Sequence, residues 1–80
     1  MKETLQILIE NLVDEPNSVT ITENVKDKSV SYEVSVSEKD IGKVIGREGK
    51  MAKSIRTIMK SIATKNKQKV TIEFIGNRGN

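Results

Sequence analysis

Residues 41–58 constrain the fold more than any other stretch of this chain. They read I-G-K-V-I-G-R-E-G-K-M-A-K-S-I-R-T-I, in which basic residues surround the segment Gly46-Arg47-Glu48-Gly49. The apolar residues change from close spacing to helical spacing at Gly49, which predicts two helices joined by a tight turn. Glycine at both ends of the turn permits positive φ and lets a ligand backbone approach closely, so a polyanion is the ligand to consider first.

The segments on either side of the turn predict one α+β domain. Apolar residues at helical spacing precede Pro16, two alternating apolar and polar runs follow it, and a third such run comes after the last helix. The expected order is αββααβ, with helices over 3–14, 38–46 and 50–63 and strands over 19–25, 30–37 and 70–74. Ser37 is expected to cap the second helix. A right-handed crossover should make the last two strands parallel, which places three helices on one face of a three-stranded mixed sheet.

The last helix is expected to have one apolar and one cationic face. Its predicted core stripe is Met51, Ile55, Ile58 and Ile62, with Ala52, Met59 and Ala63 beside it and Lys53, Arg56 and Lys60 pointing away. Tyr32 lies in phase with the apolar face of the hairpin, and we predict that it belongs to the core. The chain therefore lacks the aromatic platform on which many single-strand binders stack bases.

The composition argues against most classes of enzyme. The 80 residues include no His and no Cys, so the commonest catalytic base and the thiolate metal ligands are missing. We expect neither catalysis nor a metal or other cofactor. Residues 1–37 carry 3 Lys and 7 acids (net −4), whereas residues 38–80 carry 11 Lys or Arg and 4 acids (net +7). The basic half contains the glycine turn, which favours an acidic partner, although a solvated basic face gives the same count.

Spacing excludes two familiar nucleotide-binding motifs. In a P-loop that began at Gly42, Arg47 would stand at the second glycine. The pair Gly49-Lys50 is followed by Met51 where a P-loop needs Ser or Thr. A dinucleotide fingerprint needs G-x-G-x-x-G after a strand, but the chain has G-x-x-x-G-x-x-G after a predicted helix. What remains is G-x-x-G between helices, where the positive end of the next helix and nearby basic side chains favour a phosphate. The alternative is that the turn is only a tight corner.

With these elements in place, the sequence resembles the KH domain in its type II topology, and more narrowly the small bacterial single-KH RNA-binding proteins of the KhpA (YlqC) family. The resemblance covers residues 1–76 and is most specific over 41–58. It implies a single KH domain over 1–76 and a disordered tail over 77–80. The acidic Glu48 departs from the basic or neutral turn that is common in this fold.

The resemblance implies a protein that binds single-stranded RNA, or single-stranded DNA, by clamping the backbone of about four nucleotides. The last strand and the link over 64–69 would form the other wall of the groove, with Ile41 as a further aliphatic candidate. The implied RNA-binding residues are Lys43, Ile45, Gly46, Arg47, Glu48, Gly49, Lys50, Lys53 and Ile72. No residue is assigned to catalysis or to a metal.

The resemblance also implies partners and a cellular role. Such a protein would be a cytoplasmic post-transcriptional regulator or RNA chaperone, would form a homodimer, and would pair with a larger KH-containing protein of the Jag (KhpB) type. No apolar run is long enough for a membrane span. The alternative function is a protein-interaction or dimerisation module with weak or vestigial nucleic-acid binding, using an apolar surface around Ile7 or Met59.

Overall fold

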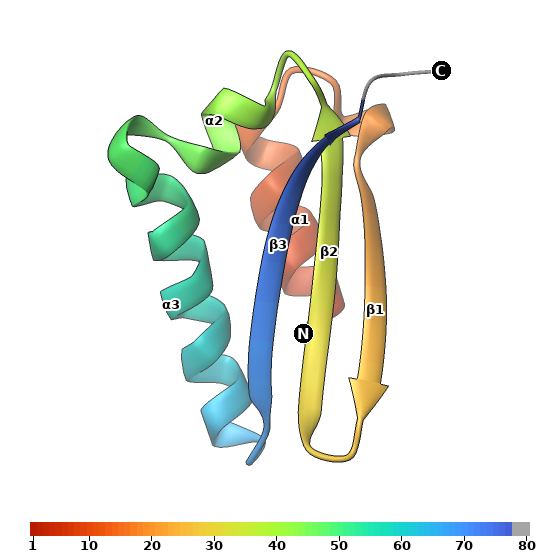
Figure 1. Ribbon diagram of the computed structural model, residues 1–80, viewed down its shortest axis with the longest axis vertical. Coiled ribbons are helices and arrows are strands. Elements are labelled where there is room, and N and C mark those ends of the chain that lie inside the picture. The colour runs from red at the N-terminus through yellow and green to blue at the C-terminus, as the bar shows by residue number, and fades with distance from the viewer. Residues whose placement is uncertain (78–80) are drawn as a thin grey trace.

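The computed structural model describes residues 1–77 and has the predicted α+β architecture (Figure 1). Its elements are α1 (Lys2–Leu12), a 3-10 turn (Pro16–Ser18), β1 (Thr20–Lys26), β2 (Ser29–Ser37), α2 (Ile41–Ile45), a 3-10 turn (Arg47–Gly49), α3 (Lys50–Lys65) and β3 (Lys69–Asn77). The sheet order is β1-β2-β3, with β1 antiparallel and β3 parallel to β2. The mixed sheet and its crossover confirm the prediction of a type II KH fold.

The helices cover only one face of the sheet. Alternate side chains of β2 are fully buried, and their partners in β1 and β3 face the same way. The large apolar side chains that are fully buried in this core are Leu5, Ile9, Tyr32, Val34, Val36, Val44 and Met59. Most side chains on the opposite sheet face are polar or charged, and the exposed Ile75 also lies there. This face is left uncovered by the helices.

Tyr32 belongs to the core, as predicted, and is only 1% exposed. Its hydroxyl donates a 2.7 Å hydrogen bond to Glu23 Oε2 on the neighbouring strand. Burial and the negative charge of Glu23 raise the pKa of Tyr32 well above its usual value, because both disfavour the phenolate. The ring therefore supports packing and is not available for stacking on a base.

The core stripe of α3 is rotated by about one position from the prediction. Ala52, Ile55, Met59 and Ala63 are buried, whereas Met51 and Ile58 are 37% and 44% exposed. The prediction was wrong because it gave weight to large apolar side chains, whereas the face of α3 that packs carries alanines at both ends. Of the two residues that the alternative function offered for a partner surface, Met59 is too deeply buried to contribute, whereas Ile7 is 59% exposed.

The N-terminus of α2 also differs from the prediction, because the helix begins at Ile41 and not at Glu38. Residues 38–40 form a turn in which the Asp40 amide donates to the Ser37 carbonyl at 2.8 Å. Asp40 is 1% exposed, and its carboxylate accepts hydrogen bonds from the amides of Asp14 and Glu15 at 3.1 and 3.0 Å. The buried carboxylate therefore joins the chain after α1 to the start of α2.

The last strand is longer than the alternating pattern suggested. β3 extends through Gly76 to Asn77, which pairs with Ser37 of β2. The remainder of the tail that we expected to be disordered, 78–80, lies outside the described residues. No helix within residues 1–77 is long and apolar enough to span a bilayer.

Candidate nucleic-acid interface

The glycine turn connects α2 to α3, and its first glycine is required by packing. Gly46 ends α2 with φ 77° and ψ 177°, a conformation that is essentially restricted to glycine. A Cβ at this position would lie 2.6 Å from Met51 Cβ and 2.9 Å from the Met51 amide nitrogen. Gly46 therefore brings the two helices closer together than any other residue would allow.

The second glycine of the turn has a different role. Gly49 adopts φ 73° and ψ 13° in the left-handed region, and no heavy atom lies within 4 Å of the position that its Cβ would take. The backbone therefore faces open space, which is what a close ligand approach needs. Between the glycines, Glu48 is also left-handed, with φ 54° and ψ 25°. An exposed glutamate thus occupies a backbone conformation that glycine and asparagine adopt at a lower energetic cost.

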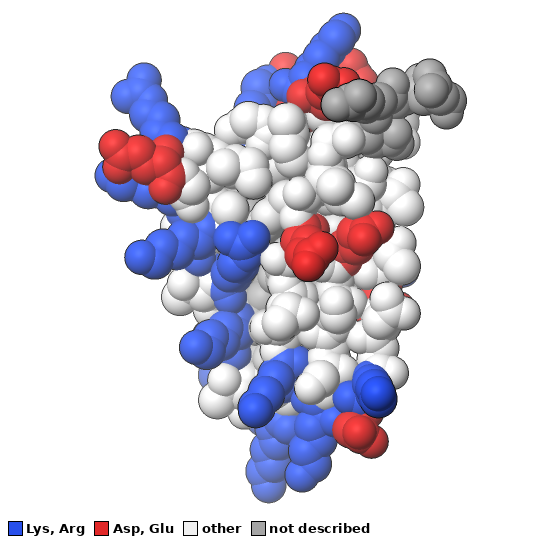
Figure 2. Space-filling model, in the orientation of Figure 1, with Lys and Arg blue, Asp and Glu red and all other residues white. Residues whose placement is uncertain are grey.

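Basic side chains surround the turn. Arg47, Lys50 and Lys53 are exposed, and within residues 1–77 none of them forms an ion pair. No side chain caps the N-terminus of α3, so the positive end of the helix macrodipole lies beside the turn. Figure 2 shows basic side chains along the side of the molecule that α3 occupies, with an acidic group at the α2–α3 corner. The turn can therefore hold an anion, with one carboxylate opposing it.

Lys43 differs from the other basic site residues because it already has partners. Its ammonium donates to the Asp14 carboxylate and lies 3.9 Å from Asp40 Oδ1. The hydrogen bond to Asp14 raises the pKa of Lys43, and both carboxylates stabilise the charged form. The structure thus places Lys43 at the junction of α1 and α2, where its charge is already partly balanced.

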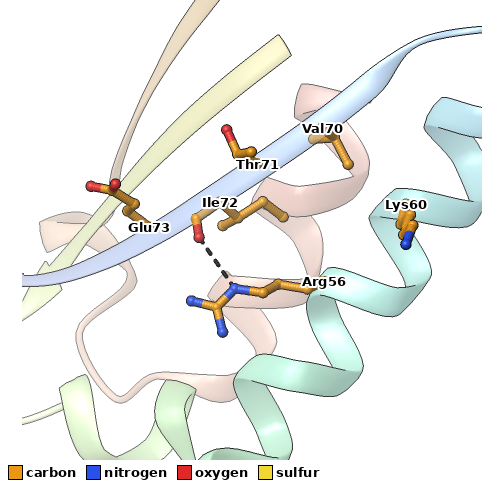
Figure 3. Close-up of a pocket in the computed structure, with 6 residues that line it drawn as sticks. All are labelled: Arg56, Lys60, Val70, Thr71, Ile72 and Glu73. Atoms are coloured by element: carbon orange, nitrogen blue, oxygen red, sulfur yellow. Dashed lines mark hydrogen bonds between the residues drawn. The ribbon is translucent and has the colours of Figure 1, made fainter. Parts of the chain in front are cut away.

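A second feature of the same side is a hollow of about 370 Å³ between α3 and β3 (Figure 3). Arg56 Nε donates to the Ile72 carbonyl at 3.2 Å, and the guanidinium carbon lies 5.2 Å from the centre of the Phe74 ring. Lys60 lines the hollow on the helix side, and Thr71 and Glu73 line it on the strand side. The guanidinium is therefore held beside the hollow by a hydrogen bond and a cation–π contact.

Not every predicted residue presents its side chain to this surface. The Ile72 side chain is 5% exposed and belongs to the core, so only its backbone reaches the edge of the sheet. Ile41 and Ile45 are half-buried and pack against the core cluster. The glycine turn, Arg47, Lys50 and Lys53 do lie together at the α2–α3 corner.

The prediction of site residues did not include Arg56, the residue that shapes the hollow. Its sequence signal was only a place on the cationic face of α3, because its contacts with β3 lie 16 residues along the chain. Within the described part of the chain, no group of His, Cys, Asp or Glu residues could hold a metal ion. The arrangement can bind an extended anionic chain, with phosphates at the turn and flat groups near Arg56.

Comparison with known proteins identifies the family of this chain. A family model described as "KhpA/KhpB, KH domain" matches residues 2–74. This chain belongs to the KhpA/KhpB family of KH domains. The family is not a family of enzymes, in agreement with the composition.

Three relatives named "RNA-binding protein KhpA" illustrate the match. The protein from Clostridium perfringens is 44% identical over 75 residues, covering 94% of this chain and 100% of its own length. Those from Listeria monocytogenes and Chlamydia pneumoniae are 41% and 45% identical over 75 residues, each covering 94% of this chain and 99% and 96% of their own lengths. The KhpA/KhpB resemblance thus extends over nearly the whole chain.

Proposed function

We propose that this protein is a non-catalytic, single-stranded RNA-binding protein. The observation that carries the proposal is the turn at Gly46–Gly49, where an open backbone lies beside the positive end of α3 and three cations without ion-pair partners in residues 1–77. The names of the relatives make RNA the polyanion to choose. Phosphates bind at the turn, and Arg47, Lys50 and Lys53 supply the countercharge.

The bases would point toward the hollow between α3 and β3. The Arg56 guanidinium is a planar group on which a base can stack, and it substitutes for the aromatic platform that the chain lacks. The backbone of β3 forms the outer edge of the sheet and supplies donors and acceptors for base edges. This arrangement fits a single strand, whose bases are unpaired and free to enter the hollow.

The open sheet face does not compete for the RNA. Glu33 and Glu73 lie directly opposite each other on β2 and β3, and both are exposed. Figure 2 shows acidic groups in the middle of this face, whereas basic groups follow α3. Two carboxylates side by side repel phosphates, so the charge distribution restricts the RNA to the α3 side.

A double substitution tests the clamp. Replacing Arg47 and Glu48 with Asp exchanges the turn cation for an acid and keeps a residue at position 48 that tolerates the left-handed region. Lys39→Asp, in the turn before α2, changes the net charge equally and is the matched control. We expect at least a tenfold loss of affinity for an oligouridylate in the first protein and a small change in the second. Unchanged binding by a folded R47D/E48D protein would contradict the proposal.

The proposal extends to the cellular role and the partners of this protein. A small RNA-binding protein with this groove would act as a post-transcriptional regulator or RNA chaperone in the cytoplasm, and single-stranded DNA should bind by the same backbone contacts. The family description joins KhpA with KhpB, which supports a larger KH-containing protein of the KhpB type as partner. Co-purification of that protein with the tagged chain, with and without nuclease, tests the partnership.

Self-association is the second candidate function, and the exposed side of α3 favours it. Ile58 is 44% exposed in a hollow that Lys50, Lys53, Ser54 and Thr57 also line. Two copies joined through Ile58, with Lys50 and Lys53 at the rim of the contact, would bring two glycine turns close together and increase avidity for one RNA. Sedimentation of the protein and of an Ile58→Asp variant measures the dimer directly. A tight dimer that is indifferent to RNA, together with no RNA binding, would favour the interaction module over the clamp.

A further inference from the structure

The end of the molecule far from the glycine turn carries a second basic hollow. It has a volume of about 620 Å³ and lies between the β1–β2 hairpin turn and the link from α3 to β3. Its basic lining residues are Lys28, Lys67 and Lys69, all exposed, and Asp27 is its one acid. Figure 2 shows basic side chains gathered at the lower end of the view, where Figure 1 places these two loops.

The two loops form one rigid unit. The Lys69 amide donates to the Lys28 carbonyl at 2.7 Å, which fastens the start of β3 to the hairpin turn. The backbone amide of Gln68 donates to the Ala63 carbonyl at 2.8 Å, and that of Lys67 donates to the Thr64 carbonyl at 3.0 Å. These two bonds close a Schellman motif. The lysines therefore project from a fixed frame and not from independent loops.

The left-handed backbone conformation at Lys67 is costly for a lysine, which supports a functional role for its charge. Lys67 adopts φ 58° at the position of a Schellman motif where glycine is usual and asparagine is next. A lysine in the left-handed region is destabilising by roughly 1 kcal/mol. Cations near the end of α3 do favour the helix dipole, but that effect does not account for Lys28 and Lys69, which come from other elements.

A cationic path connects this hollow to the turn. Lys53 and Lys60 lie one and nearly three turns along α3 from Lys50, and Arg56 lies between them. The 16 residues of α3 separate the two ends by roughly 22 Å at about 1.5 Å per residue. At roughly 3.4 Å for each stacked nucleotide, a strand needs about six nucleotides to cover that length, so a pentanucleotide held at the turn does not reach the hollow.

We propose that the hollow at Lys28, Lys67 and Lys69 is a second phosphate site, which holds RNA that continues past the four nucleotides at the glycine turn. The proposal rests on the proposed function, since the same strand occupies both sites. A short oligonucleotide should reach one site only, whereas a longer one should reach both. Affinity and salt dependence should therefore depend on RNA length.

The test uses 5′-labelled pentauridylate and dodecauridylate with the Lys28→Gln/Lys67→Asn protein. Asparagine suits the left-handed conformation at position 67, so this protein should remain folded. Lys2→Gln/Lys39→Gln removes the same charge elsewhere and is the control. Each RNA is compared between proteins, because extra binding registers favour the longer RNA in every case.

We expect dodecauridylate to bind the variant about tenfold more weakly than wild type, while pentauridylate changes less than twofold. The slope of log K against log salt should fall by about 1.4 for dodecauridylate alone, at about 0.7 per lost phosphate contact. Equal losses on both RNAs, or none on either, would overturn the second site. Wild-type protein that binds neither RNA would instead overturn the proposed function, and the second site with it.

Discussion

Gly46 and Met51 approach so closely that a single added carbon at position 46 would lie 2.6 Å from Met51 Cβ. This contact fixes how closely α3 follows α2 at the turn. The neighbouring Gly49 has no such contact. The two glycines of one motif therefore respond differently to the same substitution.

Gly46→Ala should reduce the free energy of unfolding by about 3 kcal/mol, because it adds a clash to a conformation restricted to glycine. Gly49→Ala should reduce it by about 1 kcal/mol, the usual penalty for a left-handed alanine in open space. Urea denaturation of both variants measures the difference. Equal losses would show that the turn relaxes and that the Met51 contact does not fix it.

Glu48 is expected to weaken both the fold and the binding of RNA. Its carboxylate opposes phosphate at the turn, and its backbone is left-handed. Glu48→Gln should raise RNA affinity two- to threefold without changing stability, since it removes only the charge. Glu48→Asn should raise affinity similarly and also stabilise the protein by about 0.5–1 kcal/mol. Anisotropy titration and thermal unfolding separate the two effects, and a Glu48→Gln protein that binds RNA more weakly would show that the carboxylate assists binding.

Arg56→Lys keeps the charge but removes the Nε donor and the planar group. We expect a loss of about 1 kcal/mol in stability, because the Ile72 carbonyl loses its partner and Phe74 loses the stacked cation. RNA affinity should fall by about fivefold, since a base can no longer stack on a guanidinium. Lys53→Arg on the same helix is the control and should bind at least as well as wild type. Equal affinity of both variants would show that position 56 contributes charge alone.

Asp40→Asn should destabilise the protein by about 1–3 kcal/mol, because one of two buried backbone amides then meets an NH2 group in place of an acceptor. The loosened α2 should also shift the glycine turn and weaken RNA binding. Glu3→Gln, which removes the same charge at an exposed position of α1, is the control for charge. Denaturation and RNA binding are measured on both variants. A loss of stability in Asp40→Asn without a loss of RNA affinity would contradict the link between the buried carboxylate and the turn.

The buried Tyr32 predicts a decline in stability at alkaline pH. Its pKa is higher in the folded than in the unfolded protein, so the neutral phenol contributes stability that is fully present below pH of about 10. That contribution is lost as the pH rises through the folded pKa. Tyr32→Phe cannot ionise and should show a smaller decline between pH of about 9.5 and 11.5. If the stability of both proteins declined equally with pH, the deprotonation of lysines alone would account for the alkaline effect.

The order of elements and the glycine turn could be predicted from the sequence because both depend on local patterns. Strand alternation, helical spacing and glycine at 46 and 49 are visible within a few residues. The carboxylate of Asp40 accepts hydrogen bonds from the amides of Asp14 and Glu15, which lie 26 and 25 residues away in the sequence. No local sequence pattern predicts these bonds. The ion pair of Lys43 could not be predicted for the same reason, because its partner Asp14 lies in a distant part of the sequence.

The rotation of α3 had a separate cause. Helical periodicity identifies a face but not which of two adjacent stripes packs, and the larger side chains favoured Met51 and Ile58. In the structure the alanines at 52 and 63 face inward. The hollow at Arg56 and the basic hollow at Lys67 both depend on loops and strands that meet only after folding, so composition indicated the charge but not its position.

The open sheet face also offers a place for a chemical handle. The chain has no cysteine, so Ser31→Cys, at an exposed position on the central strand, would provide a unique thiol. A fluorophore or surface tether attached there would project from the face that the helices leave uncovered, on the opposite side of the sheet from α3. Immobilised in one orientation, each molecule would present its glycine turn to solution, which suits single-molecule observation of RNA arriving and leaving.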